Sequence, residues 1–552
     1  MRFFKLFCGF LLTFSILFSL FGCGARPNVK LTPSVTAKSV VDYGFRRDTT
    51  VADNAGLKFT AWDVDAAVNA VGEQEKKART VLIYMNGSDL ESDSGEATAD
   101  LAEIMAAGTE AADMNVVVFT GGANRWRNAI IPASECAIST VRDGKLEKLT
   151  GVGLRDMGDA GTLAGFIEFG LRRFPADKTS LILWDHGGGS IAGYGQDEKF
   201  ASSSLTLLEM ELAFEKAGLA DARLELLGFD ACLMATVEMA VIAERFADCL
   251  VASEGLEPSG GWDYTCLGKV RGGDGQSFGK IITDAFVASD DQAGEEVTLS
   301  VIDTSKAANV MGALGKLADM CLAGMARDER MIEKRRASTK TFGDGSPRGD
   351  PCDMVDIVDF ARNLLDLYPN EATAVINAVR DAVPYCKYDS DKALGGLTAY
   401  HIYADWQNAP AALAVYSSLA MSDSYTLYLQ SFADAVSPRA VQSPSVRTRI
   451  GGQAARMYET SRSRDSVFYA APVHVNDGAA DLIVRVKDGA ATVMGYRREE
   501  GYMLQKGLDG LKDGDRVRFL SLTRAGWSKN GEITVTGKLD VEYNVNAPTV
   551  NN

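Results

Sequence analysis

Two short apolar segments of the chain each end at a side chain that can take part in chemistry. The segment LILWDHGGGS (181–190) contains His186, and the segment LLGFDACLMATVEMA (226–240) contains Cys232. Apolar runs of this length are typical of strands that are buried on both faces, as in a parallel sheet covered by helices. Ligands of such sheets bind at the carboxyl ends of the strands. The two segments therefore predict an imidazole and a thiol at a catalytic edge.

A cysteine attacks a carbonyl carbon as a thiolate, but a free thiol has a pKa near ~8.5 and is mostly protonated at neutral pH. A neighbouring imidazole favours the thiolate and can protonate the leaving amine. The chain has three histidines, His186, His401 and His474, of which His186 has the best context. We therefore predict a dyad of Cys232 and His186. Asp185 is expected to be structural, because consecutive side chains of a strand point to opposite faces.

The two motifs resemble those of the clostripain family of cysteine peptidases, whose fold is similar to that of caspases. The likeness covers residues 78–435. It implies an endopeptidase in which Cys232 forms a thioester that water then hydrolyses, while His186 transfers the proton. Five further segments look like that family: VLIYMNGSDLE (81–91), NVVVFTGGANRW (115–126), SEGLEPSGGWDY (253–264), TLSVIDTSK (298–306) and GLTAYHIY (396–403).

The resemblance also assigns roles to residues beside the dyad. The backbone N–H groups of Gly187 and Cys232 would form an oxyanion hole, where such donors are typically worth ~3 kcal/mol each. Asp230 matches a position associated with an S1 pocket for Arg or Lys, and Asp263 is a second candidate for that pocket. A carboxylate two residues before the nucleophile would raise the thiol pKa, which favours a substrate-binding role for it. The alternative is that Asp230 caps a helix beginning near Leu233.

Members of this family are often made as precursors that cleave themselves between the catalytic histidine and cysteine. Three basic residues lie in that interval, Lys199, Lys216 and Arg223. Lys199 falls in the polar stretch 195–204, and exposed loops are the usual sites of cleavage. We therefore expect self-cleavage at Lys199.

The beginning of the chain has the pattern of an export signal. Arg2 and Lys5 precede an almost entirely apolar run at residues 6–22. The sequence LFGC (20–23) resembles a bacterial lipobox, which would be cleaved before Cys23 and lipidated there. An ordinary signal peptide or an uncleaved anchor is the alternative. We expect a lipid-anchored protein on the extracellular face of a bacterial membrane, or on the periplasmic side if the cell has an outer membrane.

The 552 residues of the chain are too many for one ordinary core, so several domains are expected. We predict a lipoprotein signal peptide at 1–22, a tether at 23–77, a peptidase domain at 78–436 and a β-rich domain at 437–552. The alternation of strands and helices predicts an α/β fold with a mainly parallel, caspase-like sheet flanked by helices.

Periodicity and turn residues place the individual elements of this fold. Strands are predicted at 81–85, 115–120, 181–184, 225–229 and 396–403, with a hairpin at 136–150. Helices are predicted at 101–112, 162–174, 205–218 and 233–245, with a mostly helical region at 304–436. Strands of the C-terminal domain are predicted at 481–486, 492–497, 515–522 and 532–545.

Composition excludes several classes of function. The net charge of −17 argues against a nucleic-acid-binding protein, which would need a broad basic surface. The nine cysteines include no CxxC pair, so a disulfide scaffold is not expected. No zinc or nucleotide motif occurs, and no cofactor is expected to be required. The acidic stretch 87–100 fits no EF-hand loop but leaves calcium binding open.

The expected partners are peptides or proteins with basic residues, and a membrane through the lipid on Cys23. Two other functions stay open. One is a catalytically silent caspase-like lipoprotein that binds partners, although the intact His186, Gly187, Cys232 and Asp230 argue against it. The other is a thiol acyl-transferase, such as a transpeptidase, which a location at the cell surface would permit.

Overall fold

The computed structural model describes residues 57–289, 296–343, 352–388, 393–404 and 409–436, together with strands between 447 and 544. The predicted signal peptide and Cys23 lie outside these residues. The chain divides into two compact units, of which the larger contains the described residues up to Ser431 and the smaller those from Phe432 onward.

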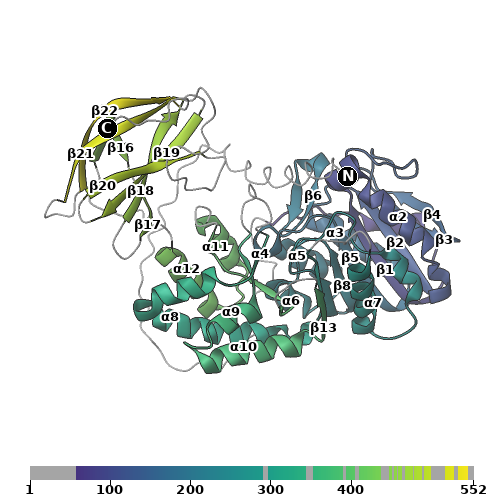
Figure 1. Ribbon diagram of the computed structural model, residues 1–552. Helices are drawn as coiled ribbons and strands as arrows, with labels where there is room; N and C mark the ends of the chain where they lie inside the picture. Colours follow the sequence, from purple (N-terminus) through teal and green to yellow (C-terminus); the bar gives the residue numbers. More distant parts are fainter. Residues whose placement is uncertain are drawn as a thin grey trace. The chain divides into compact units, whose positions relative to one another are not determined.

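The larger unit is built on one nine-stranded sheet with the order β13-β10-β9-β8-β5-β1-β2-β3-β4 (Figure 1). The central strands are parallel: β9 (Ala247–Ala252), β8 (Leu224–Asp230), β5 (Ala176–Trp184), β1 (Lys77–Asn86) and β2 (Met114–Gly121). Antiparallel strands flank them: β13 (Tyr385–Tyr388), β10 (Thr298–Asp303), β3 (Ala137–Arg142) and β4 (Lys145–Gly151). The predicted mainly parallel sheet and the hairpin at 136–150 are confirmed.

The central strands are apolar on both faces because helices cover both faces (Figure 1). Ile83 of β1 belongs to a core that includes Leu101 of α2 (Glu96–Ala106) and Phe278 of α7 (Gly275–Ala288). The next residue back, Leu82, faces the opposite way and contacts Gly170 of α3, where a Cβ would lie 2.5 Å from a Leu82 methyl carbon. The helices on this second face are α1 (Val64–Ala70), α3 (Ala160–Arg173) and α5 (Leu207–Lys216).

Two helices differ from their predicted bounds. The helix predicted at 101–112 begins earlier, at Glu96, and ends at Ala106, because Gly108 takes a left-handed conformation (φ 67°) and breaks it. The helix predicted at 233–245 begins only at Val237, as α6 (Val237–Ala243), since the side chain of Thr236 caps it by accepting from the Met239 N–H at 3.0 Å.

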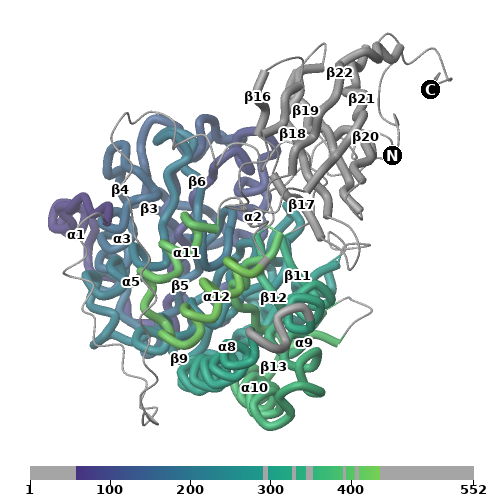
Figure 2. The backbone as a smooth tube through the Cα atoms, turned by 90° about the vertical axis from the view of Figure 1, so that its left-hand side faces the viewer, coloured from purple at the N-terminus to yellow at the C-terminus, as the bar shows by residue number. Residues whose placement is uncertain are grey.

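The chain after the sheet is mainly helical, as predicted for 304–436. Helices α8, α9 and α10 lie side by side (Figure 2). A separate antiparallel sheet is formed by β11 (Thr341–Phe342), β12 (Met354–Asp356) and β14 (Thr398–Tyr400), the last within the strand predicted at 396–403. The helices are α8 (Ala307–Ala337), α9 (Ile357–Asn363), α10 (Pro369–Ala382), α11 (Ala409–Ser418) and α12 (Asp423–Val436).

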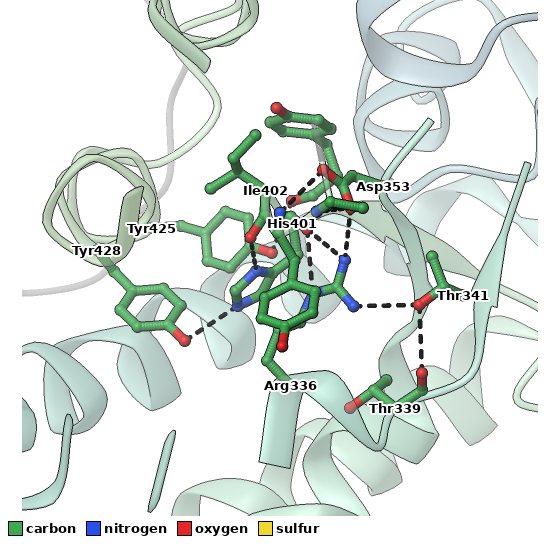
Figure 3. A network of polar contacts seen from close by, with 11 residues as sticks. Arg336, Thr339, Thr341, Asp353, His401, Ile402, Tyr425 and Tyr428 are labelled. Carbon is green, nitrogen blue, oxygen red and sulfur yellow. Dashed lines mark hydrogen bonds and ion pairs between the residues drawn. The ribbon is translucent and has the colours of Figure 1, made fainter. Parts of the chain in front are cut away.

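A buried polar network joins α8 to this small sheet (Figure 3). Arg336 donates to the Asp353 carboxylate at 3.1 Å and to the His401 carbonyl at 2.6 Å. The ring of His401 pairs with the Tyr428 hydroxyl at 3.0 Å. Burial and the Arg336 charge hold the pKa of His401 well below its usual value, so this histidine is neutral and structural.

The smaller unit consists of antiparallel strands. Its sheets are β17-β18-β19-β20, β15-β16 and β21-β22. The strands are β15 (Arg447–Ile450), β16 (Gln453–Arg456), β17 (Tyr458–Arg462), β18 (Val467–Val475), β19 (Gly478–Lys487), β20 (Ala490–Arg498), β21 (Arg516–Trp527) and β22 (Ile533–Asn544). The predicted all-β character of this region is confirmed. In the part of the chain that the structure describes, no helix is both long enough and apolar enough to cross a bilayer.

The buried ion pair of Arg336 and Asp353 makes a testable contribution to stability. Arg336→Ala should lower the free energy of unfolding by about 3–5 kcal/mol, because it leaves a buried carboxylate without its cation. The neighbouring Arg335→Ala is the control, since its pair with Asp366 is 30% and 55% exposed and should contribute less than about 1 kcal/mol. Denaturant unfolding measures both, and equal losses would contradict the expectation.

Candidate active site

The carboxyl ends of β5 and β8 bring the two catalytic segments together. The strands are parallel neighbours with Trp184 opposite Asp230, and the Asp185 N–H donates to the Asp230 carbonyl at 3.3 Å. The residues that follow, His186 and Cys232, therefore leave the sheet at the same edge. This is the juxtaposition that the apolar segments predict.

Gly187 lies directly against the backbone of Cys232. A Cβ at this position would be 2.0 Å from the Cys232 carbonyl oxygen and 3.1 Å from its nitrogen, so no larger residue fits. The chain then turns sharply at Leu233, which has a positive φ of 65° and donates its N–H to the Gly255 carbonyl at 2.9 Å. The two amides expected to form the oxyanion hole are thus carried by backbone segments in contact.

His186 is held by an aspartate that the sequence analysis did not identify. Its Nε2 lies 2.8 Å from the Asp89 carboxylate, and the two side chains are 25% and 20% exposed. Burial lowers the pKa of His186, but the hydrogen bond to the Asp89 carboxylate and the charge of Asp185 outweigh it, and the pKa is raised overall. Burial likewise opposes ionisation of Asp89, yet the His186 contact leaves the pKa of Asp89 lowered. Both shifts favour the charged forms of the pair, the His186 imidazolium and the Asp89 carboxylate.

Asp89 could have been predicted from the rule that neighbouring parallel strands end at the same edge of the sheet. Strand β1 is the other parallel neighbour of β5, with Met85 opposite Trp184, so residues shortly after Met85 must reach the same edge. Ser88 has a positive φ of 46°, which turns the chain sharply just before Asp89. In the sequence analysis, Asp89 is treated only as part of an acidic stretch.

Asp185 is directed away from the catalytic ring, as expected for the residue before His186. Its carboxylate accepts from Asn86 Nδ2 at 2.5 Å and from the Gln196 N–H at 2.6 Å. Burial raises the pKa of Asp185 to about 7. Its role is to tie together three chain segments at the sheet edge.

The thiol of Cys232 is held by the segment SEGLEPSGGWDY. Its Sγ accepts from the Glu257 N–H at 3.2 Å. Burial raises the pKa of Cys232 to about 11, so the thiol is protonated in this arrangement. The thiol also donates to the Glu257 carbonyl at 3.8 Å. In the described residues, Sγ has these contacts with the Glu257 backbone and no hydrogen bond to His186, whose Nε2 bonds Asp89.

Asp230 is buried at the end of β8, two residues before the nucleophile. Its carboxylate accepts from the Tyr264 hydroxyl at 2.8 Å and from the Trp262 N–H at 3.4 Å. Burial raises its pKa to about 6. Asp230 is not a helix cap, because Thr236 caps α6, so that alternative is wrong.

Other carboxylates surround Asp230, and we call Asp100, Glu103, Asp230 and Glu257 the acidic cluster. Asp100 of α2 accepts from Trp184 Nε1 at 2.6 Å, and burial together with the Asp230 charge raises its pKa well above the usual value. Burial and the Asp230 charge also raise the pKa of Glu257 well above the usual value. Glu103 accepts from the Tyr264 N–H at 2.8 Å and adds a further charge near Asp230.

The second S1 candidate, Asp263, makes a different contact. Its carboxylate accepts from the Thr265 N–H at 2.9 Å and caps the short helix η7 (Tyr264–Lys269). In the GWDY segment, the described contacts to Asp230 come from Trp262 and Tyr264.

Lys199 lies at the tip of the hairpin of β6 (Tyr194–Asp197) and β7 (Ser203–Leu205). The residue is half-buried, and its N–H donates to the Asp197 carboxylate at 2.8 Å. Ala201, two residues on, is exposed. The hairpin leaves the sheet edge just after the glycines that follow His186.

Acidic side chains of the stretch 87–100 accept hydrogen bonds from other groups of the protein. Glu91 accepts from the Thr98 N–H at 2.8 Å, and Asp100 belongs to the acidic cluster. Across the described ranges, no group of three or more His, Cys, Asp or Glu side chains is suited to hold a metal ion. The described cysteines are all free thiols: Cys136, Cys232, Cys249, Cys266, Cys321, Cys352 and Cys386.

The solved structures that match the chain include a secreted protease and an inactive zymogen. A secreted C11 cysteine protease from Bacteroides thetaiotaomicron is 17% identical, and the match covers 64% of this chain and 100% of that chain with a TM-score of 0.49. An inactive zymogen C11 protease from Parabacteroides distasonis is also 17% identical, with 64% and 99% covered and a TM-score of 0.49. No curated protein matches the chain.

The family comparison covers most of the larger unit. It matches residues 83–437 to the clostripain family, a span that includes the end of β1, both catalytic segments and the acidic cluster. On this match, the chain belongs to the clostripain family of cysteine peptidases.

Proposed function

We propose that this peptidase is an endopeptidase that cleaves after Arg or Lys. The observation that carries the proposal is the acidic cluster, whose members Asp230 and Glu257 flank the thiol of Cys232. Buried carboxylates that lack a cation are costly, and each raised pKa reflects that cost. A guanidinium or ammonium group of the substrate would supply the missing positive charge through charge-assisted hydrogen bonds.

In the proposed mechanism, His186 takes the thiol proton and Cys232 attacks the carbonyl carbon after the basic residue. The negative charge that develops on the carbonyl oxygen would be met by the N–H groups of Gly187 and Cys232. His186 then gives its proton to the leaving amine as the C–N bond breaks, which leaves a thioester on Cys232. Water attacks this thioester with His186 as base, releasing the acid and the free thiol.

Two contacts favour the charged form of the dyad. The Glu257 N–H that donates to Cys232 Sγ would stabilise a thiolate more than a thiol. The Asp89 carboxylate stabilises the imidazolium that forms when His186 accepts the proton. Asp89 is therefore proposed as a positioning residue, which adds a third group to the predicted dyad.

The proposal further includes attachment to a membrane and self-cleavage. We infer that the signal at 1–22 is removed and that Cys23 carries lipid, which would place the peptidase outside the cytoplasmic membrane. Cleavage at Lys199 would open the hairpin beside the catalytic edge.

Short fluorogenic peptides that differ only in the cleaved residue test the specificity. Cleavage after Arg or Lys should exceed cleavage after Asp and should vanish in Cys232→Ala. Asp230→Asn should lower kcat/KM for Arg and Lys by about 100-fold, the effect of removing one partner of a buried charge pair. Asp263→Asn is the comparison variant. Unchanged cleavage after Arg by Asp230→Asn would refute the role of Asp230, and product formed with an added amine would reveal acyl transfer.

The contact of Asp89 with His186 predicts a change in pH dependence. Asp89 raises the pKa of His186, so the imidazolium persists to higher pH and is lost as pH rises through that value. Because His186 must be neutral to take the thiol proton, Asp89→Asn should lower this pKa and shift the acidic limb of kcat/KM to lower pH, with a smaller maximum. Asp93→Asn, at an exposed position nearby, should leave the profile unchanged. Identical profiles for all three proteins would show that Asp89 has no such role.

Intact mass spectrometry of protein recovered from expressing cells tests both processing steps. A chain that begins at Cys23 with an acyl mass increment is expected, together with fragments that meet at Lys199. Lys199→Ala should keep the chain in one piece, whereas Lys216→Ala, within helix α5, should be cut normally. A fully active, uncut Lys199→Ala protein would remove the proposed requirement for cleavage, and an unmodified Cys23 would remove the lipid anchor.

A further inference from the structure

Glu257 lies between the catalytic thiol and the acidic cluster, and the mechanism above uses only its backbone. Its N–H contacts Cys232 Sγ at 3.2 Å. Its carboxyl group is close enough to both Asp230 and Cys232 for their charges to raise its pKa, after burial as the main cause. The side chain therefore lies close to both the thiol and Asp230.

The carboxyl group of Glu257 differs from the others in the acidic cluster because its main neighbour is another acid. Asp100, Glu103 and Asp230 each accept from Trp184, Trp262 or Tyr264. Both oxygens of Glu257 are buried, and its carboxyl group interacts with the side chains of Asp230 and Trp262.

One neutral donor lies in the same region. Trp262 is 2% exposed, and its side chain interacts with the Glu257 carboxyl group and lowers the pKa of that group. The Trp262 backbone N–H contacts Asp230, so this indole borders the acidic cluster. Two adjacent buried acids that have neutral donors and no cation are costly. A cationic group that enters from outside and carries several donors would offset that cost.

We propose that Glu257 is a specificity-determining residue of the S1 site, whose carboxylate binds the positive charge of the substrate side chain together with Asp230. This inference rests on the proposed cleavage after Arg or Lys and adds a second charged contact to it. A guanidinium has five N–H donors in a planar fork and can serve two carboxylates at once. In the free enzyme the two acids interact with each other, and the Asp230 charge raises the pKa of Glu257, whereas a substrate cation would favour the charged form of both.

The test uses the full chain and three peptides that differ only at the cleaved residue, which is Arg, Lys or citrulline. Citrulline has the shape of Arg but no charge, so the ratio of kcat/KM for Arg to that for citrulline isolates the charge contact. Glu257→Gln should lower this ratio about tenfold or more while citrulline cleavage stays near the wild-type rate. Glu257→Asp, which keeps a carboxylate, should restore part of the ratio.

Glu110→Gln is the matched control, since it removes one negative charge at an exposed position and should leave the ratio unchanged. Melting temperatures and alkylation of Cys232 establish that each variant is folded with its thiol present. An unchanged Arg-to-citrulline ratio in Glu257→Gln would overturn this inference while leaving cleavage after Arg or Lys intact. An equal loss for all three peptides would also overturn it, in favour of a structural role. Wild-type protein that cleaves after neither Arg nor Lys would overturn both proposals.

Discussion

The parallel pairing of β5 with β8 is the constraint on which the site depends. With Trp184 opposite Asp230, the next few residues of both strands leave the sheet together, and Gly187 comes to rest on the backbone of Cys232. A one-residue slip in this register would exchange every side chain between the two faces of the sheet. The apolar side chains on both faces hold the register, so packing in the core fixes the spacing of the catalytic groups.

The same edge also collects negative charge that the fold alone does not neutralise. In a folded protein, buried acids are normally paired with cations, as Asp353 is with Arg336 in the larger unit. Asp100 and Asp230 instead rely on neutral donors from Trp184 and Tyr264. Neutral donors satisfy oxygens of both acids without supplying a cation, and burial raises the pKa of both acids.

Sequence reasoning located the features that follow from local pattern. The buried strands and the residues that end them, His186 and Cys232, can be read from apolar runs followed by polar side chains. Asp89 and Glu257 could not be found in that way, because their positions depend on which strands are neighbours and on where loops turn back. The start of α6 was predicted too early, because Leu233 takes a left-handed conformation and the helix begins only after it. A glycine would have indicated such a turn in the sequence, but this position is a leucine.

The protonated state of Cys232 has a practical consequence for detecting this peptidase in a mixture of proteins. A thiol with a pKa near 11 reacts slowly with electrophiles that capture thiolates. Chemical probes for reactive cysteines would therefore label this arrangement of Cys232 slowly. Labelling intensity would underestimate the amount of the peptidase, and an antibody or a mass measurement would be needed to count the whole population.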